Sequence, residues 1–350
     1  MRAFRLSAVL LMVLAAVVTT VPMALAKTPK AAPAPPAAKS LLEGLELFQV
    51  DTAHSPIEFS VGWMGLSKVR GAFADYAATI ALDRVDLARS SVTLVIRTKS
   101  LTTFNDFRDR DLKGAAWFDV EKFPTAVFTS REVVKQGDGY VMRGSLAFHG
   151  VTKDIEIPFT FIGRLKDLGG LDRAGFEGHA ALNRKDYGIV GPARYNALLE
   201  LGKAMVGDEV ELPLTIEGFH LTVRDTLPDH PADSLWRAIV ARGPAPVAKD
   251  YRALHSTTPD SLMPVNESRM NTVGYQLVDG GRALDGLEVF KLQAEAFPQS
   301  ASGLTGMAYA YATLGDRENA AASADKAVAI NPLATRALEI LRHAKAAAVN

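Results

Sequence analysis

The chain contains no cysteine, and this absence removes several classes of protein at once. Without thiols there is no disulfide framework, no thiolate nucleophile, no cysteine-based zinc or iron–sulfur site and no cysteine to carry a lipid. The chain also carries no formal net charge, because 39 Lys and Arg residues balance 39 Asp and Glu residues. A balanced chain offers no global attraction for a polyanion such as nucleic acid. We therefore expect a packed core, ligands recognised at local sites, and no nucleic-acid partner.

Long apolar runs are also scarce, and the clearest one lies near the N-terminus. Two arginines precede an apolar run at residues 6–18, and Ala24-Leu25-Ala26 follows it in the small-x-small pattern that signal peptidase reads. The run falls short of the roughly 20 residues that a membrane-spanning helix needs. We expect residues 1–26 to be a cleaved secretory signal, which makes the mature chain periplasmic and free of transmembrane segments; an uncleaved anchor is the alternative. Residues 27–44 are expected to be a tether, because Pro and Ala dominate them and favour extended chain.

Between residues 45 and 224 apolar side chains recur at every second position, as in strands with one buried face. Glycine-rich clusters at residues 136–139 and 168–170 predict hairpin turns. Seven or eight such strands without intervening helices indicate an antiparallel sandwich or a closed barrel. A charged insertion interrupts the pattern, with a short helix expected at residues 106–114. The clearest alternating stretches are residues 57–63, 92–96, 155–161 and 210–216.

Beyond residue 226 the period changes to that of helices. Residues 234–242 and 246–255 fit amphipathic helices, and residues 333–348 fit a closing helix. Between them, three pairs of like residues are each 34 positions apart, which is the tetratricopeptide period: Tyr275 and Tyr309, Gly281 and Gly315, Pro298 and Pro332. We expect a tetratricopeptide-like module over residues 229–350; an unrelated pair of helical hairpins is the alternative.

Several separated blocks of the strand region, in order, resemble the YceI family of exported, lipocalin-like barrels. The resemblance covers residues 48–221 and implies a mainly β domain that binds a polyisoprenoid or another amphiphile inside an antiparallel barrel, without chemistry and without a cofactor. It departs at Trp63, where the family has a histidine, which removes the imidazole that would contact a head group there. The blocks are residues 51–55, Phe59 and Val61, 69–73, Asp83, 108–109, Leu112, 118–119, 123–124, Phe128, 144–146, 149–152, 183–184 and 186–188.

A barrel of about eight strands either fills its interior with side chains or encloses one elongated ligand. The alternating apolar and aromatic residues serve both outcomes, so each candidate is either plain core or cavity lining. An apolar pocket with one polar group at its mouth suits a prenyl tail with a small head. The candidate ligand-binding residues are Phe59, Val61, Trp63, Phe73, Phe128, Leu146, Phe148, Phe159 and Phe161.

The polar clusters favour structural roles. Residues 108–111 alternate in charge, which is typical of a solvated helix face or of salt bridges at the barrel rim, with contact to a ligand at the mouth as the alternative. Asn183, Arg184 and Asp186 look like a turn held by hydrogen bonds between side chains and backbone, with a bidentate Arg–carboxylate pair as a further alternative. The histidines of the barrel, His54, His149, His179 and His220, lack metal-ligand spacing, so no metal site is predicted.

Catalytic motifs are missing too, and an enzyme is not predicted. A hydrolase that uses His54 with a nearby carboxylate is the weakest alternative. The sequence thus predicts a secreted binding protein that holds a hydrophobic amphiphile, with the helical module recruiting a protein partner or mediating self-association. The main alternative is a periplasmic adaptor that acts through its helices and has a solid barrel.

Overall fold

The computed structural model describes residues 39–168, 170–220, 231–258, 263 and 265–346. Residues 38–350 form one compact unit. The predicted secretory signal and most of the predicted tether lie outside the described residues. Among the helices that are described, none is long and apolar enough to cross a membrane.

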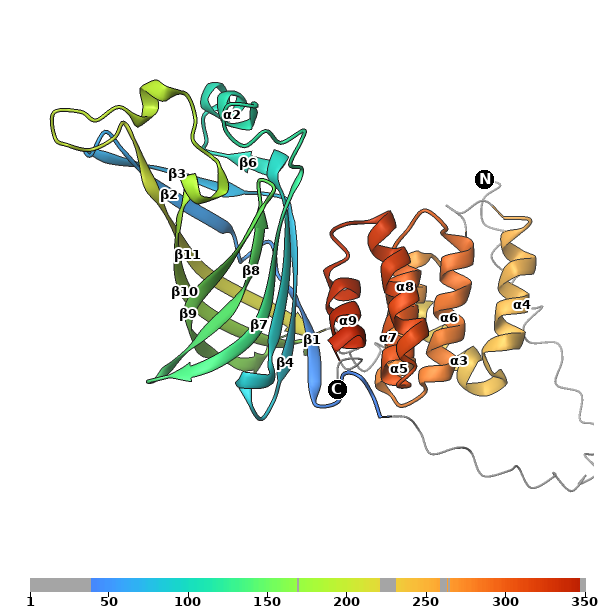
Figure 1. Cartoon of the computed structure of the whole chain (residues 1–350). Coiled ribbons are helices and arrows are strands. Elements are labelled where there is room, and N and C mark those ends of the chain that lie inside the picture. The colour runs from blue at the N-terminus through green and yellow to red at the C-terminus, as the bar shows by residue number, and fades with distance from the viewer. Residues whose placement is uncertain (1–38, 169, 221–230, 259–262, 264, 347–350) are drawn as a thin grey trace, which may run out of the picture. The chain divides into compact units, whose positions relative to one another are not determined.

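One antiparallel sheet forms the barrel (Figure 1). β1 pairs with β4 on one side and with β11 on the other, and this closes β1, β4, β5, β7, β8, β9, β10 and β11 into a ring. The predicted antiparallel barrel is therefore confirmed. The strands are β1 Leu45–Val50, β2 Ile57–Trp63, β3 Ser67–Phe73, β4 Tyr76–Asp83, β5 Ser91–Arg97, β6 Leu101–Thr102, β7 Thr125–Gln136, β8 Gly139–Phe148, β9 Val151–Lys166, β10 Asp172–Asn183 and β11 Val206–His220.

The sheet has more strands than the seven or eight predicted, because β11 is long enough to pair with two partners. Its last residues pair with β1, as Phe48 does with His220, while its first half pairs with β2, as Val61 does with Val210. β2, β3 and β6 therefore continue the wall beyond the closed ring. Alternation in sequence becomes alternation in burial: in β9, Ile155, Ile157 and Phe159 are half-buried, whereas their neighbours are exposed.

A seam interrupts this wall beside β3. β3 pairs with β6 only at Ala72 and Phe73, so among the described strands none pairs with the free edge at residues 67–71. The chain that follows β6 continues into α2 Asp106–Lys113, the short helix expected in the charged insertion. Asn105 begins α2 as its N-cap, because its Oδ1 accepts a hydrogen bond from the Arg108 backbone N–H at 3.0 Å.

Helices make up the C-terminal part of the unit, as predicted. The loops of two successive hairpins are alike: Gly281 with φ 79° ends the turn before α6, and Gly315 with φ 75° does so before α8. Glycine adopts this left-handed conformation without strain, which explains its recurrence after 34 residues. The helices are α3 Pro231–Arg242, α4 Pro244–His255, α5 Glu267–Asp279, α6 Ala283–Ala296, α7 Ser302–Thr313, α8 Arg317–Ile330 and α9 Thr335–Ala346.

Helix α9 packs on the outer face of β4 and β5. Glu339 is fully buried there and accepts hydrogen bonds from the hydroxyls of Ser91 and, at 2.6 Å, Thr93. The hydroxyls of Thr79 and Thr335 are 2.8 Å apart in the same contact. Buried polar groups therefore join the barrel to the helices, and each finds a partner across the contact.

Candidate functional site

The interior of the barrel contains two apolar cavities. Cavity A, of about 120 Å³, lies between the strands away from α2, and hydrocarbon forms nearly all of its wall. Cavity B, of about 180 Å³, lies beneath α2 and the seam. Cavity A is lined by residues that include Ile57, Tyr76, Ile80, Leu82, Leu94, Met142, Phe176, Leu214 and Ile216, and cavity B by residues that include Val69, Leu112, Trp117, Phe118, Leu182, Tyr195 and Leu212.

The two cavities contain seven of the nine predicted ligand-binding residues in their walls. Phe128 and Phe159 line cavity A. Cavity B has Phe59, Val61, Trp63, Phe73 and Phe148 in its wall. Contact of these side chains with a ligand stays a prediction.

Two predicted residues line neither cavity. Leu146 is buried in the cluster around Trp117 and Phe128. Phe161 packs on Phe176 with ring centroids 5.3 Å apart. Both contribute to the packed core around the cavities, and their contact with a ligand also stays a prediction.

Cavity B has polar wall residues that the alternation could not reveal, because they lie outside the regular strands. Arg108 comes from α2, while Arg184 and Tyr187 come from the short helix Arg184–Tyr187. The signal that could have found them is the family resemblance, since all three fall within its blocks. Their side chains give the wall of cavity B a polar character that cavity A lacks.

Arg108 is held in place by Thr103. Its Nε donates to Thr103 Oγ1 at 2.7 Å, and its Nη2 donates to the Thr103 carbonyl at 2.8 Å. Asp109 accepts from the backbone N–H of the same threonine at 2.8 Å. Burial alone would raise the pKa of Asp109, but the hydrogen bonds from Thr103 outweigh it and lower that pKa. This carboxylate is thus a fixed structural acceptor.

Arg184 holds the loop between β10 and β11. Its guanidinium is buried and donates to the carbonyls of Ile189 at 2.8 Å and Gly207 at 2.9 Å and to Asp208 Oδ1 at 3.0 Å. Burial lowers the pKa of Arg184, and the charge of Asp208 opposes this shift. Arg184 thus pairs with Asp208, which lies outside the predicted turn, and not with Asp186, which pairs with Lys153.

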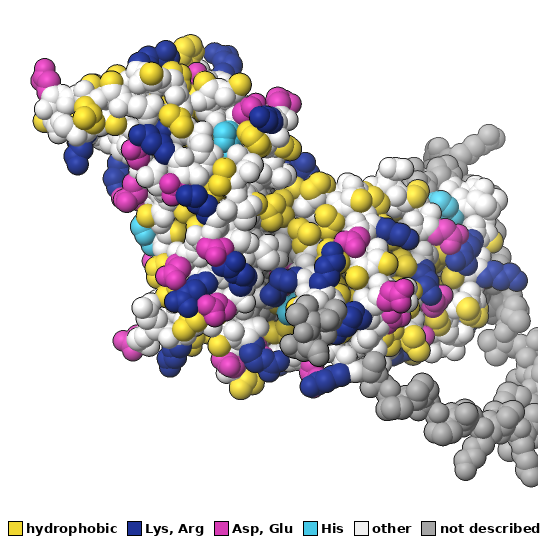
Figure 2. Space-filling model, viewed as in Figure 1, with side chains coloured by type: hydrophobic (Ala, Val, Ile, Leu, Met, Phe, Trp, Pro, Cys, Tyr) yellow, Lys and Arg dark blue, Asp and Glu magenta, His cyan; other side chains and the backbone are white. Residues whose placement is uncertain are grey.

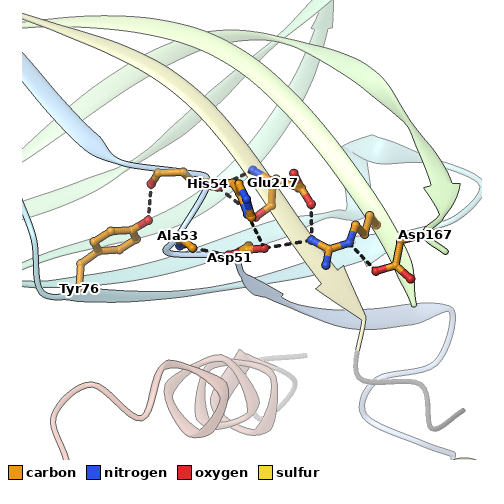
Figure 3. A network of polar contacts seen from close by, with 8 residues as sticks. Asp51, Ala53, His54, Tyr76, Asp167 and Glu217 are labelled. Carbon is orange, nitrogen blue, oxygen red and sulfur yellow. Dashed lines mark hydrogen bonds and ion pairs between the residues drawn. The ribbon is translucent and has the colours of Figure 1, made fainter. Parts of the chain in front are cut away.

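At the end of the barrel remote from α2, a network of ion pairs ties the segments that follow β1 and β9 to β10 and β11 (Figure 3). Arg173 donates to Asp51 at 3.0 Å, to Asp167 at 2.8 Å and also to Glu217. His54 Nδ1 is 3.0 Å from Asp51 Oδ2, and together with Arg173 it lowers the pKa of that carboxyl. The family block at residues 51–55 thus fixes the β1–β2 connection to β11.

His54, the candidate residue of a hydrolase, pairs with Asp51 in this network. Ser55, the hydroxyl next to His54, is buried; its Oγ donates to the Glu217 carbonyl at 3.2 Å and accepts from the Glu217 N–H at 2.8 Å. In the described part of the chain, no three His, Asp or Glu side chains are grouped to hold a metal ion. What the geometry offers is enclosed apolar space.

A closed antiparallel barrel with a hollow apolar interior belongs to the lipocalin-like class of β-barrels. Residues 48–218 match the model of the YceI-like domain. A UPF0312 protein from Yersinia pestis is 38% identical over 165 residues, which are 47% of this chain and 81% of that protein. The chain belongs to the YceI-like family through its barrel.

Solved structures of similar proteins include two that match this region. The YCEI protein of Campylobacter jejuni is 27% identical with a TM-score of 0.38, and the match covers 44% of this chain and 86% of that one. A polyisoprenoid binding domain from Saccharophagus degradans, implicated in plant cell wall breakdown, is 14% identical with a TM-score of 0.36 and matches over 50% of this chain and 99% of its own.

Proposed function

We propose that this chain is an exported, periplasmic binding protein whose barrel holds a hydrophobic amphiphile, with a polyisoprenoid as the first candidate. The observation that carries the proposal is the pair of apolar cavities within one closed barrel. Enclosed apolar space is costly to leave empty, because its lining loses dispersion contacts and water gains no polar partners there. An apolar chain fills such space favourably at about 25 cal/mol for each Å² of apolar surface removed from water.

Family membership and the apolar N-terminal run support the remaining parts of the proposal. We infer that the barrel acts by binding: Arg108 and Arg184 in the wall of cavity B are engaged in structural hydrogen bonds, while the buried hydroxyl of Tyr187 has no partner among the described residues. The helical module would contact a protein partner or a second copy through surfaces that the barrel leaves uncovered. The alternative of a solid barrel receives no support from the cavities.

The experiment is to express the protein in its own host, extract it with organic solvent and examine the extract by mass spectrometry. We expect one class of apolar chain at a near-stoichiometric amount. An extract without lipid, from folded protein, would contradict the proposal.

Charged substitutions test whether the two cavities hold the apolar chain. Trp63→Glu in cavity B and Phe159→Glu in cavity A each place a carboxylate in an apolar wall, at a cost of several kcal/mol unless it is neutralised. We expect either variant to lose the co-purified lipid while keeping the barrel's circular dichroism. Ile162→Glu is the matched control, because Ile162 lies on the same strand as Phe159 but is 62% exposed. Folded cavity variants with a full lipid content would show that these residues do not line the binding site.

A further inference from the structure

A pocket of about 360 Å³ opens at the seam beside β3, and most of its lining residues are polar or charged. One side is the free edge of β3, with Ser67, Lys68 and Arg70, and the other side is Thr103 with Arg108. Trp63, Val69 and Arg108 line both this pocket and cavity B. The seam pocket therefore adjoins cavity B, and these three side chains form the wall between them.

The seam pocket is cationic. Three of its lining residues are Lys68, Arg70 and Arg108, and its lining contains no acid. Lys68 pairs with Glu211 outside the pocket. In the described part of the chain, neither Arg70 nor Arg108 has a carboxylate within 4.0 Å. Two guanidinium groups thus share one pocket in which the described residues supply them no counter-ion.

The position of one of these guanidinium groups is fixed by a buried threonine. Thr103 is buried and fixes Arg108 through two hydrogen bonds, so the guanidinium is held in one orientation at the boundary between the two spaces. A preorganised guanidinium loses little freedom when it binds an oxyanion, and it donates charge-assisted hydrogen bonds. Figure 2 shows Lys and Arg side chains beside hydrophobic and acidic ones over the α2 end of the barrel.

We propose that the seam pocket binds the anionic head group of an amphiphile, a phosphate or a carboxylate, whose apolar tail enters cavity B past Trp63. This inference rests on the proposed function and specifies it, because a neutral head would leave the cationic pocket unused. The tail would be selected by apolar contact, and the head by Arg70 and Arg108.

The test compares ligands that share one tail. Dodecyl phosphate, dodecanol and inorganic phosphate are titrated into the chain from residue 27 onward, which retains the whole compact unit and lacks the apolar N-terminal run. The readout is tryptophan fluorescence, because Trp63 and Trp117 line cavity B. We expect dodecyl phosphate to bind roughly 10- to 100-fold more tightly than dodecanol, as charge-assisted hydrogen bonds provide. High salt should reduce this preference.

Substitutions test whether the seam pocket causes the preference for dodecyl phosphate over dodecanol. Arg70→Gln should reduce the preference for dodecyl phosphate several-fold, and Arg70→Gln with Arg108→Gln should abolish it while dodecanol binding persists. Arg110→Gln is the matched control, since it removes the same charge from α2 at a residue outside the pocket. If Arg108→Gln perturbs folding, Arg70→Gln alone still decides, because Arg70 is an exposed residue of the β3 edge.

The outcomes separate this inference from the function on which it rests. Equal binding of dodecanol and dodecyl phosphate would overturn the head-group site and leave the lipid-binding barrel standing. Inorganic phosphate that binds as tightly as dodecyl phosphate would overturn it too, since the pocket would then serve a free anion. Absence of binding by all the amphiphiles would contradict both proposals.

Discussion

His220 lies at the end of β11 with 9% of its surface exposed, and its ring centroid is 5.4 Å from that of Phe48. Burial lowers its pKa to about 4, and the positive charges of Arg336 and Arg164 add to this shift, while Glu46 and Asp172 oppose it. The ring is therefore neutral in the folded protein at pH 6, where the unfolded chain is already partly protonated.

This shift predicts acid lability. A histidine pKa that is depressed on folding contributes stability that is fully present above the unfolded value of 6.5 and is lost as the pH falls through 6.5 towards 4. The loss amounts to about 3 kcal/mol for this residue. We expect His220→Gln to show a shallower decline of unfolding free energy over this range, measured by urea titration. The difference in unfolding free energy between the two proteins at pH 7.5 measures the effect of the substitution on packing. If the unfolding free energies of both proteins fall equally steeply below pH 6.5, His220 is not the source of the acid lability.

At the scale of elements, the sequence predicted strands and helices best where one hydrophobic period, of two or of 3.6 residues, continued over a whole element. β2, β9 and β11 follow their alternating residues. α2 agrees with the expected helix at residues 106–114 to within one residue, and α9 begins two residues after the expected start at residue 333; the expected end at residue 348 lies outside the described residues. The closure of the ring could not be read this way, because it depends on β11 pairing with two strands far away in the sequence.

The candidate site was predicted only in its apolar part. Alternation identifies inward-facing residues such as Phe59 and Phe159, but it cannot tell a lining residue from a packed one such as Leu146. The polar wall comes from Arg108 and Tyr187, which lie in short helices between the strands. Their position depends on where α2 and the β10–β11 loop pack, and that is a tertiary property.

The helical hairpins α5–α6 and α7–α8 pack closely because a glycine of α7 lies at their contact. A Cβ added to Gly306 of α7 would lie 2.1 Å from Phe290 of α6, a fully buried ring. We expect Gly306→Ala to destabilise the protein by roughly 1–3 kcal/mol, because overpacking outweighs the gain in helix propensity. Lys326→Ala, at an exposed position of α8, is the control and should leave thermal stability nearly unchanged. A Gly306→Ala protein as stable as wild type would show that Phe290 can move aside.

At the scale of the whole molecule, the question is how the barrel and the helices depend on each other. The domain borders expected from the sequence, residues 45–224 and 229–350, stay a prediction. Residues 38–350 form one compact unit, in which Leu47 and Ala81 of the barrel share an apolar cluster with Ala308 and Ile340 of the helices. The outer face of β1 and β4 is therefore buried against the helices. Period-two alternation alone would have assigned this face to solvent.

Glu339 makes this dependence measurable. Burial would raise its pKa, but hydrogen bonds from His343, Arg342 and Ser91 and the charge of Arg342 outweigh burial and lower the pKa to about 2. We expect Glu339→Gln to destabilise the whole unit by roughly 2–4 kcal/mol at pH 7, because breaking a buried pair leaves Arg342 without its counter-ion. Guanidinium unfolding followed by far-ultraviolet circular dichroism measures this.

Glu295→Gln is the matched control, since Glu295 pairs with Arg252 at 2.8 Å on the surface and its side chain is 55% exposed. Exposed pairs contribute at most about 1 kcal/mol. The pH dependence adds a second measurement: a lowered carboxyl pKa contributes stability that is present above the unfolded value of 4.5 and is lost as the pH falls towards 2, so the difference between wild type and Glu339→Gln should shrink over that range. If the two Glu→Gln variants are equally stable at pH 7, the contact of α9 with β5 does not couple the barrel to the helices.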